Sequence, residues 1–196
     1  TNIQQMAEDA LAKMAQTYHP ESAAAIVLDA RTGEVLALAN YPGFDPNAPG
    51  KFKPIRWRNR AVADLYEPGS TLKVVTVAAG LNEGIAPRAI ICNCAKKEQI
   101  KGSRISCVVH HPFYSGHGAV DMYKIIQHSC NIGAAHVGFR LGSKKLHAYD
   151  KAFGLLDPID AGFGCEAVGR MLPPEDWRLI RLANVAFGQG IAVTPL

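Results

Sequence analysis

The sequence predicts an α/β fold in the broad, mixed α+β sense. Two β-like runs, 23–30 and 34–40, flank the tight turn Arg31-Thr32-Gly33 and predict a hairpin that starts an antiparallel sheet. Residues 70–83 form a helical pattern that is apolar on nearly all sides and stops at Gly84. Because a helix of this kind is buried, we expect it to lie between the sheet and a helical subdomain.

The composition excludes several classes of protein. Hydrophobic residues make up 48% of the 196 residues and charged residues 19%, so the chain is not a disordered one. No apolar run approaches the roughly 20 residues that a membrane span needs. A net charge of +4 gives no nucleic-acid footprint, and no nucleic-acid partner is expected.

The remaining elements are predicted from the spacing of apolar residues and from the capping, proline and glycine residues at their ends. Residues 3–17 place apolar side chains at helical spacing, whereas 41–54 hold four prolines and two glycines and predict a loop. Residues 85–119 lack a clear period, apart from a small hairpin expected at 99–105. Four further helices are expected: Asp121 (as N-cap) to His128, Asn131–Leu141, Ser143 (as cap) to about Phe153, and Pro173 to about Phe187.

The first candidate site is Ser70 with Lys73, at the start of the buried helix. Three residues of spacing put both side chains on one helix face. A serine hydroxyl needs a base to become a nucleophile, and lysine is a base only when burial or positive charge lowers its pKa. The helix N-terminus adds N–H groups, including that of Ser70, that stabilise an oxyanion. The alternative is a serine N-cap beside an unrelated surface lysine.

The second candidate site is Ser129-Cys130-Asn131, at the junction of two predicted helices. A hydroxyl and an amide two residues apart can point into one cleft. There the hydroxyl relays a proton and the amide holds a substrate peptide group. The alternative is ordinary helix capping by Ser129 and Asn131.

Cys94, Cys107, His117 and Cys130 form a candidate metal site, since thiolate and imidazole ligands suit tetrahedral zinc. Cys94 and Cys107 bracket the predicted hairpin. Cys130 faces away from the cleft if its two neighbours face into it, so a metal would hold Ser129 from behind.

Other interpretations of these cysteines stay open. His110, His111 and Cys92 are substitute ligands. A Cys94–Cys107 or Cys92–Cys107 disulfide, or buried thiols without a metal, would also account for the cluster.

Taken together, the motifs of the first two candidate sites resemble those of a known protein family. Ser-x-x-Lys followed 59 residues later by Ser-x-Asn is typical of penicillin-recognising serine acyltransferases and β-lactamases. From about residue 22 the chain resembles class B penicillin-binding proteins, in the segments Ala39–Asn47, Asn59–Val62, Tyr66–Thr71, Ser129–Gly133, Phe187–Gly190 and Val193–Leu196.

The resemblance implies a penicillin-binding transpeptidase fold, an antiparallel sheet with helices on both faces. It implies Ser70 as the nucleophile that attacks the D-Ala-D-Ala end of a peptidoglycan stem peptide and is acylated by β-lactams. Lys73 is then its base, Ser129 a proton relay and Asn131 a substrate contact. Some elongation-type members resemble the Cys/His arrangement, which implies a structural Zn²⁺ but no cofactor for catalysis.

The resemblance also implies a setting. The site is expected outside the cytoplasmic membrane, in the periplasm, with an anchor upstream of Thr1 and a membrane glycan polymerase as partner. The family's third motif, Lys-Thr/Ser-Gly, does not occur in the sequence. We therefore expect residues 1–196 to be the N-terminal portion of a transpeptidase domain, with a helical subdomain at about 85–187, and to turn over nothing alone.

Two other functions compete with transpeptidation. A serine β-lactamase or β-lactam sensor uses the same first motifs, but the sequence holds no motif for a water-activating base. A non-catalytic binding module would have no reason to keep Ser70, Lys73, Ser129 and Asn131 together.

Overall fold

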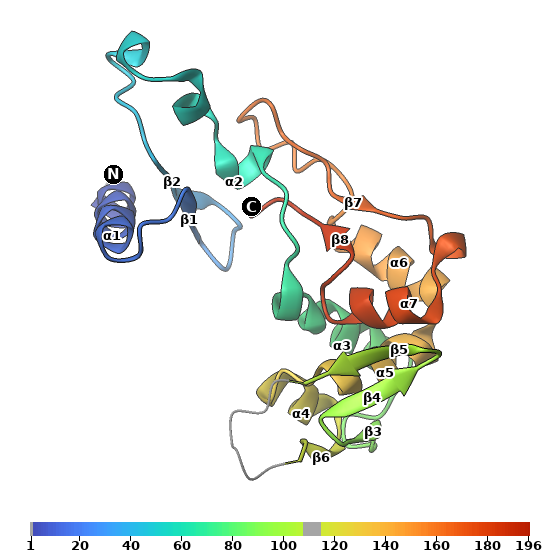
Figure 1. Cartoon of the computed structure of the whole chain (residues 1–196). Coiled ribbons are helices and arrows are strands. Elements are labelled where there is room, and N and C mark those ends of the chain that lie inside the picture. Colours follow the sequence, from blue (N-terminus) through green and yellow to red (C-terminus); the bar gives the residue numbers. More distant parts are fainter. Residues whose placement is uncertain (1, 108–114) are drawn as a thin grey trace. The chain divides into compact units, whose positions relative to one another are not determined.

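The computed structural model describes residues 2–107 and 115–196, and its chain forms two compact units (Figure 1). The first unit comprises Thr1–Tyr66, Pro158–Val168 and Thr194–Leu196. The second comprises Glu67–Asp157 and Gly169–Val193. Within the described residues, no helix combines the length and the apolarity needed to cross a bilayer.

The first unit is built on helix α1 (Asn2–Tyr18) and the antiparallel strands β1 (Ala23–Leu28) and β2 (Val35–Tyr41). Its core consists largely of small side chains, which allow the helix to approach the strands closely. They are Ala7, Leu11, Ala37 and Ala39. The predicted N-terminal helix and hairpin are confirmed to within two residues at their ends.

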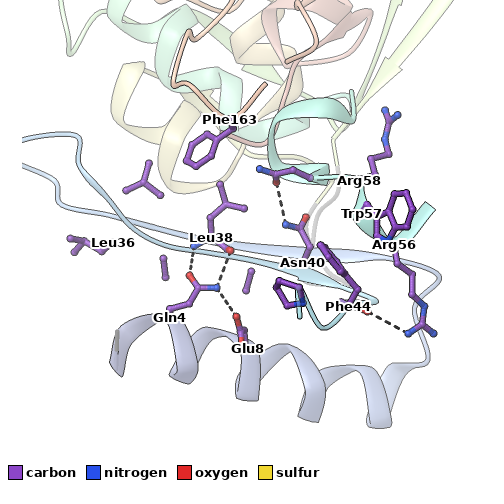
Figure 2. Close-up of a pocket in the computed structure, with 16 residues that line it drawn as sticks. Gln4, Glu8, Leu36, Leu38, Asn40, Phe44, Arg56, Trp57, Arg58 and Phe163 are labelled. Carbon is purple, nitrogen blue, oxygen red and sulfur yellow. Dashed lines mark hydrogen bonds between the residues drawn. The ribbon is translucent and has the colours of Figure 1, made fainter. Parts of the chain in front are cut away.

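A side chain of α1 also pairs with the backbone of β2 (Figure 2). The Gln4 amide accepts from Leu38 N at 2.8 Å and donates to Leu38 O at 3.0 Å, as a neighbouring strand would. A pocket of about 500 Å³ lies in this unit, lined by Asn40, Phe44 and Trp57 among others. The remaining short elements of the unit are Pro49–Lys51, Pro54–Trp57 and α2 (Arg60–Ala63).

The second unit is mostly helical. The 3₁₀ turn Gly69–Leu72 leads directly into α3 (Lys73–Asn82). The other helices are α4 (Met122–Gln127), α5 (Asn131–Leu141), α6 (Ser143–Ala152) and α7 (Leu179–Ala186). Figure 1 shows α3, α5, α6 and α7 gathered around one core, which Ile132, Val137, Leu146 and Val185 help to fill.

Three short strand pairs complete the second unit. Strands β4 (Lys97–Ile100) and β5 (Ser103–Ser106) confirm the predicted hairpin and extend it. Periodicity did not predict the pairs β3 (Cys92–Cys94) with β6 (Gly118–Val120) and β7 (Arg170–Met171) with β8 (Ile191–Ala192), because strands of two or three residues carry no period. The mixed α/β class is confirmed.

Three local predictions need correction. Ser143 does not cap α6; Gly142, with φ +77°, stands at that position. The helix predicted from Pro173 is two pieces, because Trp177 is extended between the 3₁₀ turn Pro174–Asp176 and α7, with its indole N–H donating to Leu172 O.

The third correction concerns the burial of α3. Its predicted burial on nearly all sides holds for one face, since Val74 and Leu81 are 58% and 41% exposed. The position of this helix relative to the hairpin stays a prediction.

Candidate functional site

Ser70 and Lys73 lie on one face of the chain where the 3₁₀ turn joins α3. Gly69 precedes them with φ +58°, a conformation that glycine adopts without strain. The turn leaves Ser70 exposed and Lys73 buried, and Lys73 Nζ lies 3.0 Å from Ser70 Oγ. The predicted sharing of a face is confirmed.

Lys73 is surrounded by oxygen atoms. Its side chain is 1% exposed, and Nζ donates to Ser129 O at 2.7 Å, to Ser129 Oγ at 2.9 Å and to Asn131 Oδ1 at 2.6 Å. The carbonyl and amide oxygens can only accept, so they occupy two N–H groups. In the neutral amine the remaining lone pair is then free to take a proton from a hydroxyl.

Burial lowers the pKa of Lys73 to about 8, because the charged ammonium loses its hydration. Negative charge on Cys107 and Cys130 opposes this by favouring the ammonium. A lysine with this pKa is partly neutral near neutral pH, which is the requirement for a base.

Ser129 completes a triangle of contacts. Its hydroxyl donates to Ser70 Oγ at 2.8 Å, so both serine hydroxyls and the Lys73 amine touch one another. The residue sits between α4 and α5 with φ +51°, an unusual backbone for a non-glycine residue. Helix α4 ends at Gln127, two residues before Ser129. Its N-cap is Asp121, as predicted, and the Asp121 carboxylate accepts from Lys124 N.

The capping alternative for Ser129 and Asn131 is wrong. The N-cap of α5 is Cys130, whose sulfur accepts from Gly133 N at 3.2 Å. This leaves the two polar side chains to face Lys73, and Asn131 Nδ2 also donates to Ser106 O at 2.9 Å. The structure thus brings the four predicted residues together, while the Ser106 carbonyl was missed because a backbone acceptor leaves no sequence signal.

The four predicted metal ligands also meet. The ligand atoms of Cys94, Cys107, His117 and Cys130 all lie within 4.8 Å of one another. The sulfurs of Cys94 and Cys107, and of Cys107 and Cys130, are 3.6 Å apart, and Cys94 Sγ is 3.7 Å from His117 Nδ1. Tetrahedral zinc with Zn–S bonds of about 2.3 Å places neighbouring sulfurs about 3.8 Å apart. A metal ion fits this donor set.

Local pairing explains how these ligands converge. In the β3–β6 pair Cys94 lies opposite Gly118, beside His117. A Cβ on Gly116 would come within 1.9 Å of the Cys94 carbonyl oxygen, so this close approach requires glycine. Cys107 follows β5 and donates its N–H to Lys96 O at 2.8 Å.

Helix α5 donates backbone N–H groups to two of the sulfurs. Ile132 N donates to Cys107 Sγ at 3.4 Å, and Gly133 N to Cys130 Sγ. Hydrogen bonding from Cys130, and then from the Ile132 N–H, holds the pKa of Cys107 below its usual range. The same hydrogen bond between Cys107 and Cys130, together with burial, raises the pKa of the Cys130 thiol. Cys107 is therefore the sulfur at which these contacts favour the thiolate, the form that ligates a metal.

Of the three residues named as substitute ligands, only Cys92 lies among the described residues. Cys92 lies in β3 outside the cluster, and burial raises the pKa of its thiol to about 12. His110 and His111 lie outside the described residues. All five cysteines are free thiols in the structure.

Comparisons with known proteins show the family to which the chain belongs. The family model for the penicillin binding protein transpeptidase domain matches residues 23–196. The chain is 32% identical to the probable peptidoglycan D,D-transpeptidase FtsI of Caulobacter vibrioides, over 99% of this chain and 32% of that protein. It is also 32% identical to the stage V sporulation protein D of Bacillus subtilis, over 100% of this chain and 30% of that protein. The chain thus spans about a third of these relatives.

A solved structure supports the same family. The transpeptidase domain of penicillin-binding protein 3 from Burkholderia pseudomallei superposes with a TM-score of 0.83 at 29% identity, over 98% of this chain and 52% of that chain. The matched segment contains both serine motifs, and its fold is that of the matched part of the domain. The chain therefore belongs to the penicillin-binding protein transpeptidase domain family.

Proposed function

We propose that this chain carries the acylation machinery of a peptidoglycan D,D-transpeptidase. The observation that supports it most is the triangle of the Ser70 hydroxyl, the Ser129 hydroxyl and the buried Lys73 amine, each within 3.0 Å of the other two. A hydroxyl in contact with a partly neutral amine is an activated nucleophile.

The proposed reaction starts when Ser70 Oγ attacks the carbonyl carbon of the D-Ala-D-Ala peptide bond and its proton passes to Lys73 Nζ. The tetrahedral oxyanion is stabilised by the Ser70 N–H. A proton then passes through the Ser129 hydroxyl to the leaving amine, the C–N bond breaks and D-Ala departs. An amine of a second stem peptide attacks the ester, releasing Ser70 and forming the cross-link. Asn131 holds the substrate peptide group.

Labelling with a fluorescent penicillin tests this proposal. In the full-length protein we expect one covalent adduct, located at Ser70 by peptide mass spectrometry and absent from Ser70→Ala. Ser143→Ala, at the first residue of α6, is the matched control and should label normally. Labelling that survives in Ser70→Ala would overturn the assignment. The 196 residues alone are expected to show no turnover.

The lifetime of the adduct separates the competing enzymes. A transpeptidase keeps the penicilloyl ester for many minutes, because no group activates water against it. A β-lactamase releases it within seconds. A binding module forms no adduct at all.

We propose that the Cys94, Cys107, His117 and Cys130 cluster holds a structural Zn²⁺. The sulfur separations and the hydrogen bonds that favour thiolate support this. Because Cys130 lies between Ser129 and Asn131, and Cys107 follows Ser106, the ion would fix the backbone behind both polar side chains.

Elemental analysis of protein prepared without chelator tests the zinc proposal. We expect about one zinc per chain, lost in Cys94→Ser and kept in the control Cys92→Ser, which alters a neighbouring β3 thiol outside the cluster. Protein without stoichiometric metal, or a disulfide between Cys94 and Cys107, would end it.

The proposed substrate also implies a place and partners. Peptidoglycan stem peptides lie outside the cytoplasmic membrane, so we propose that the site works there, with a membrane glycan polymerase as partner. Labelling of intact cells with a penicillin that does not enter the cytoplasm should modify Ser70. Cross-linking in such cells should recover the polymerase.

A further inference from the structure

Two segments far apart in the sequence pair at the turn that precedes Ser70. The Glu67 carboxylate accepts from Gly190 N at 2.7 Å, and Gly69 N donates to Gly188 O at 2.9 Å. These bonds join the two ends of the turn Glu67–Gly69 to the two ends of the loop Gly188–Gly190. We call this pair of bonds the 67–190 clamp.

The two segments of the 67–190 clamp pack so closely that their backbones leave no room for a side chain at Gly188. Gly188 has φ +89°, and a Cβ on it would come within 1.8 Å of Gly69 O. The loop is held from its other side by the Arg181 guanidinium, which donates to Gly190 O at 3.4 Å. Further along, the buried Thr76 hydroxyl donates to Ala186 O at 2.9 Å and ties α3 to the end of α7.

We propose that Glu67 is a positioning residue for the nucleophile. Its carboxylate fixes the Gly188–Gly190 loop against Gly69, and the loop in turn fixes the direction in which the 3₁₀ turn presents the Ser70 hydroxyl and N–H. Glu67 touches none of Ser70, Lys73 or Ser129 through a hydrogen bond of the structure. It acts through the backbone, and this inference rests on the proposed acylation of Ser70.

A position of this kind controls rate more than affinity. Displacement of a reacting atom by about 1 Å costs on the order of 100-fold in rate, because the attack geometry is lost. The initial non-covalent binding of a penicillin does not depend on that geometry. Loss of the clamp should therefore slow acylation and leave the dissociation constant of the first complex almost unchanged.

The variants can be chosen so that they fold. The side chain of Glu67 borders an open pocket of about 620 Å³, so Glu67→Ala leaves no closed cavity. Glu67→Gln keeps an oxygen that accepts from Gly190 N. Glu67→Asp keeps the charge but is one methylene too short. Glu175→Ala, in the exposed turn before α7, is the matched control.

Stopped-flow acylation of the full-length protein by a fluorescent penicillin separates the dissociation constant from the acylation rate constant. For Glu67→Ala and Glu67→Asp we expect about a 10- to 100-fold slower acylation step with binding within twofold. Glu67→Gln should stay within about threefold of wild type, since its amide oxygen replaces the acceptor. Equal rates in wild type and Glu67→Asp, equal losses in Gln and Ala, or a change confined to binding would overturn the inference.

Hydrogen exchange provides a readout that needs no acylation. The amides of Gly69 and Gly190 should exchange faster in Glu67→Ala and Glu67→Asp, and as in wild type in Glu67→Gln. Unchanged exchange in all variants means that Glu67 does not hold the clamp. Altered exchange in a protein that never labels Ser70 removes the proposed function but leaves the clamp itself.

Discussion

Helices α3 and α6 each bury one ionisable side chain completely, and the two surroundings are opposite. Lys73 is 1% exposed and has four oxygen contacts within 3.0 Å. Asp150 is 0% exposed, and neither carboxylate oxygen has a hydrogen-bond partner among the described residues. Burial lowers the pKa of Lys73 to about 8 and raises that of Asp150 to about 7.

A perturbed pKa is therefore a poor marker of a site by itself. Desolvation shifts both groups by the same physics, and it favours the neutral form of each. Only Lys73 lies against groups that can exchange a proton with it. Hydrogen-bond partners, rather than burial, therefore separate a candidate base from a group that only weakens the fold.

Removal of the Lys73 amine should give the largest effect. Lys73→Met keeps the apolar stem and roughly the volume, but leaves the Ser70 hydroxyl without a base. We expect acylation by a fluorescent penicillin to fall at least about 1000-fold. Lys145→Met, which removes an exposed lysine paired with Glu83, is the control and should acylate normally. A loss of less than tenfold in Lys73→Met would place the base elsewhere.

Asp150 should affect stability and leave acylation unchanged. Its folded pKa of about 7 lies above the unfolded value of 3.8, so the native state binds the extra proton and stability falls as pH rises between about 4 and 7. Asp150→Asn removes this loss and should raise the free energy of unfolding by up to about 4 kcal/mol at pH 9, with little effect at pH 3.

Chemical denaturation at both pH values measures this difference. Asp157→Asn, at an exposed position soon after α6, is the matched control and should give no pH-dependent gain. An Asp150→Asn variant that is less stable than wild type at pH 9 would mean that the buried carboxylate has a stabilising partner.

The pH dependence of acylation should report Lys73 directly. A lysine acts as base in its neutral form, so the rate should rise about tenfold per pH unit well below its pKa and level off above about 8, a gain of about 50-fold from pH 6 to pH 8. Lys73 also contributes to the pH dependence of the free energy of unfolding, and its contribution has the opposite sign to that of Asp150. The unfolded chain binds more protons between about 8 and 10.5, so stability rises with pH there. A flat rate profile from pH 6 to 9 would exclude Lys73 as the titrating base.

Much of the grouping of the candidate site residues could be predicted from the sequence, and the exceptions have physical causes. Ser70 and Lys73 share a face because helical spacing requires it, and Ser129 and Asn131 could be paired with them by motif. The proposed metal ligands could be grouped because cysteine and histidine are uncommon residues and these four lie close together in the sequence. The cap of α5 was not foreseen, because sulfur is a rare N-cap and the flanking serine and asparagine are better ones.

The long-range backbone contacts were beyond sequence reasoning. Nothing in the sequence pairs Gly69 with Gly188, although both adopt a positive φ in the structure. Asp150 was also missed, since it lies in a helix with otherwise ordinary polarity and only burial makes it unusual. Strands of two and three residues depend on their partners for existence, and local sequence does not encode the pairing.

A charged partner for Lys73 should give the smallest and most specific effect. Asn131→Asp places a carboxylate where Asn131 Oδ1 lies 2.6 Å from Nζ, and a negative charge at that distance favours the ammonium. The rise of acylation with pH should move upward, so that the rate at pH 7 falls about tenfold while much of it returns above pH 9. Asn131→Ser removes the amide without adding charge, and its loss should be the same at both pH values. If both variants lose rate equally at every pH, Asn131 acts on the substrate alone, and the oxygen atoms around Lys73 do not set its basicity.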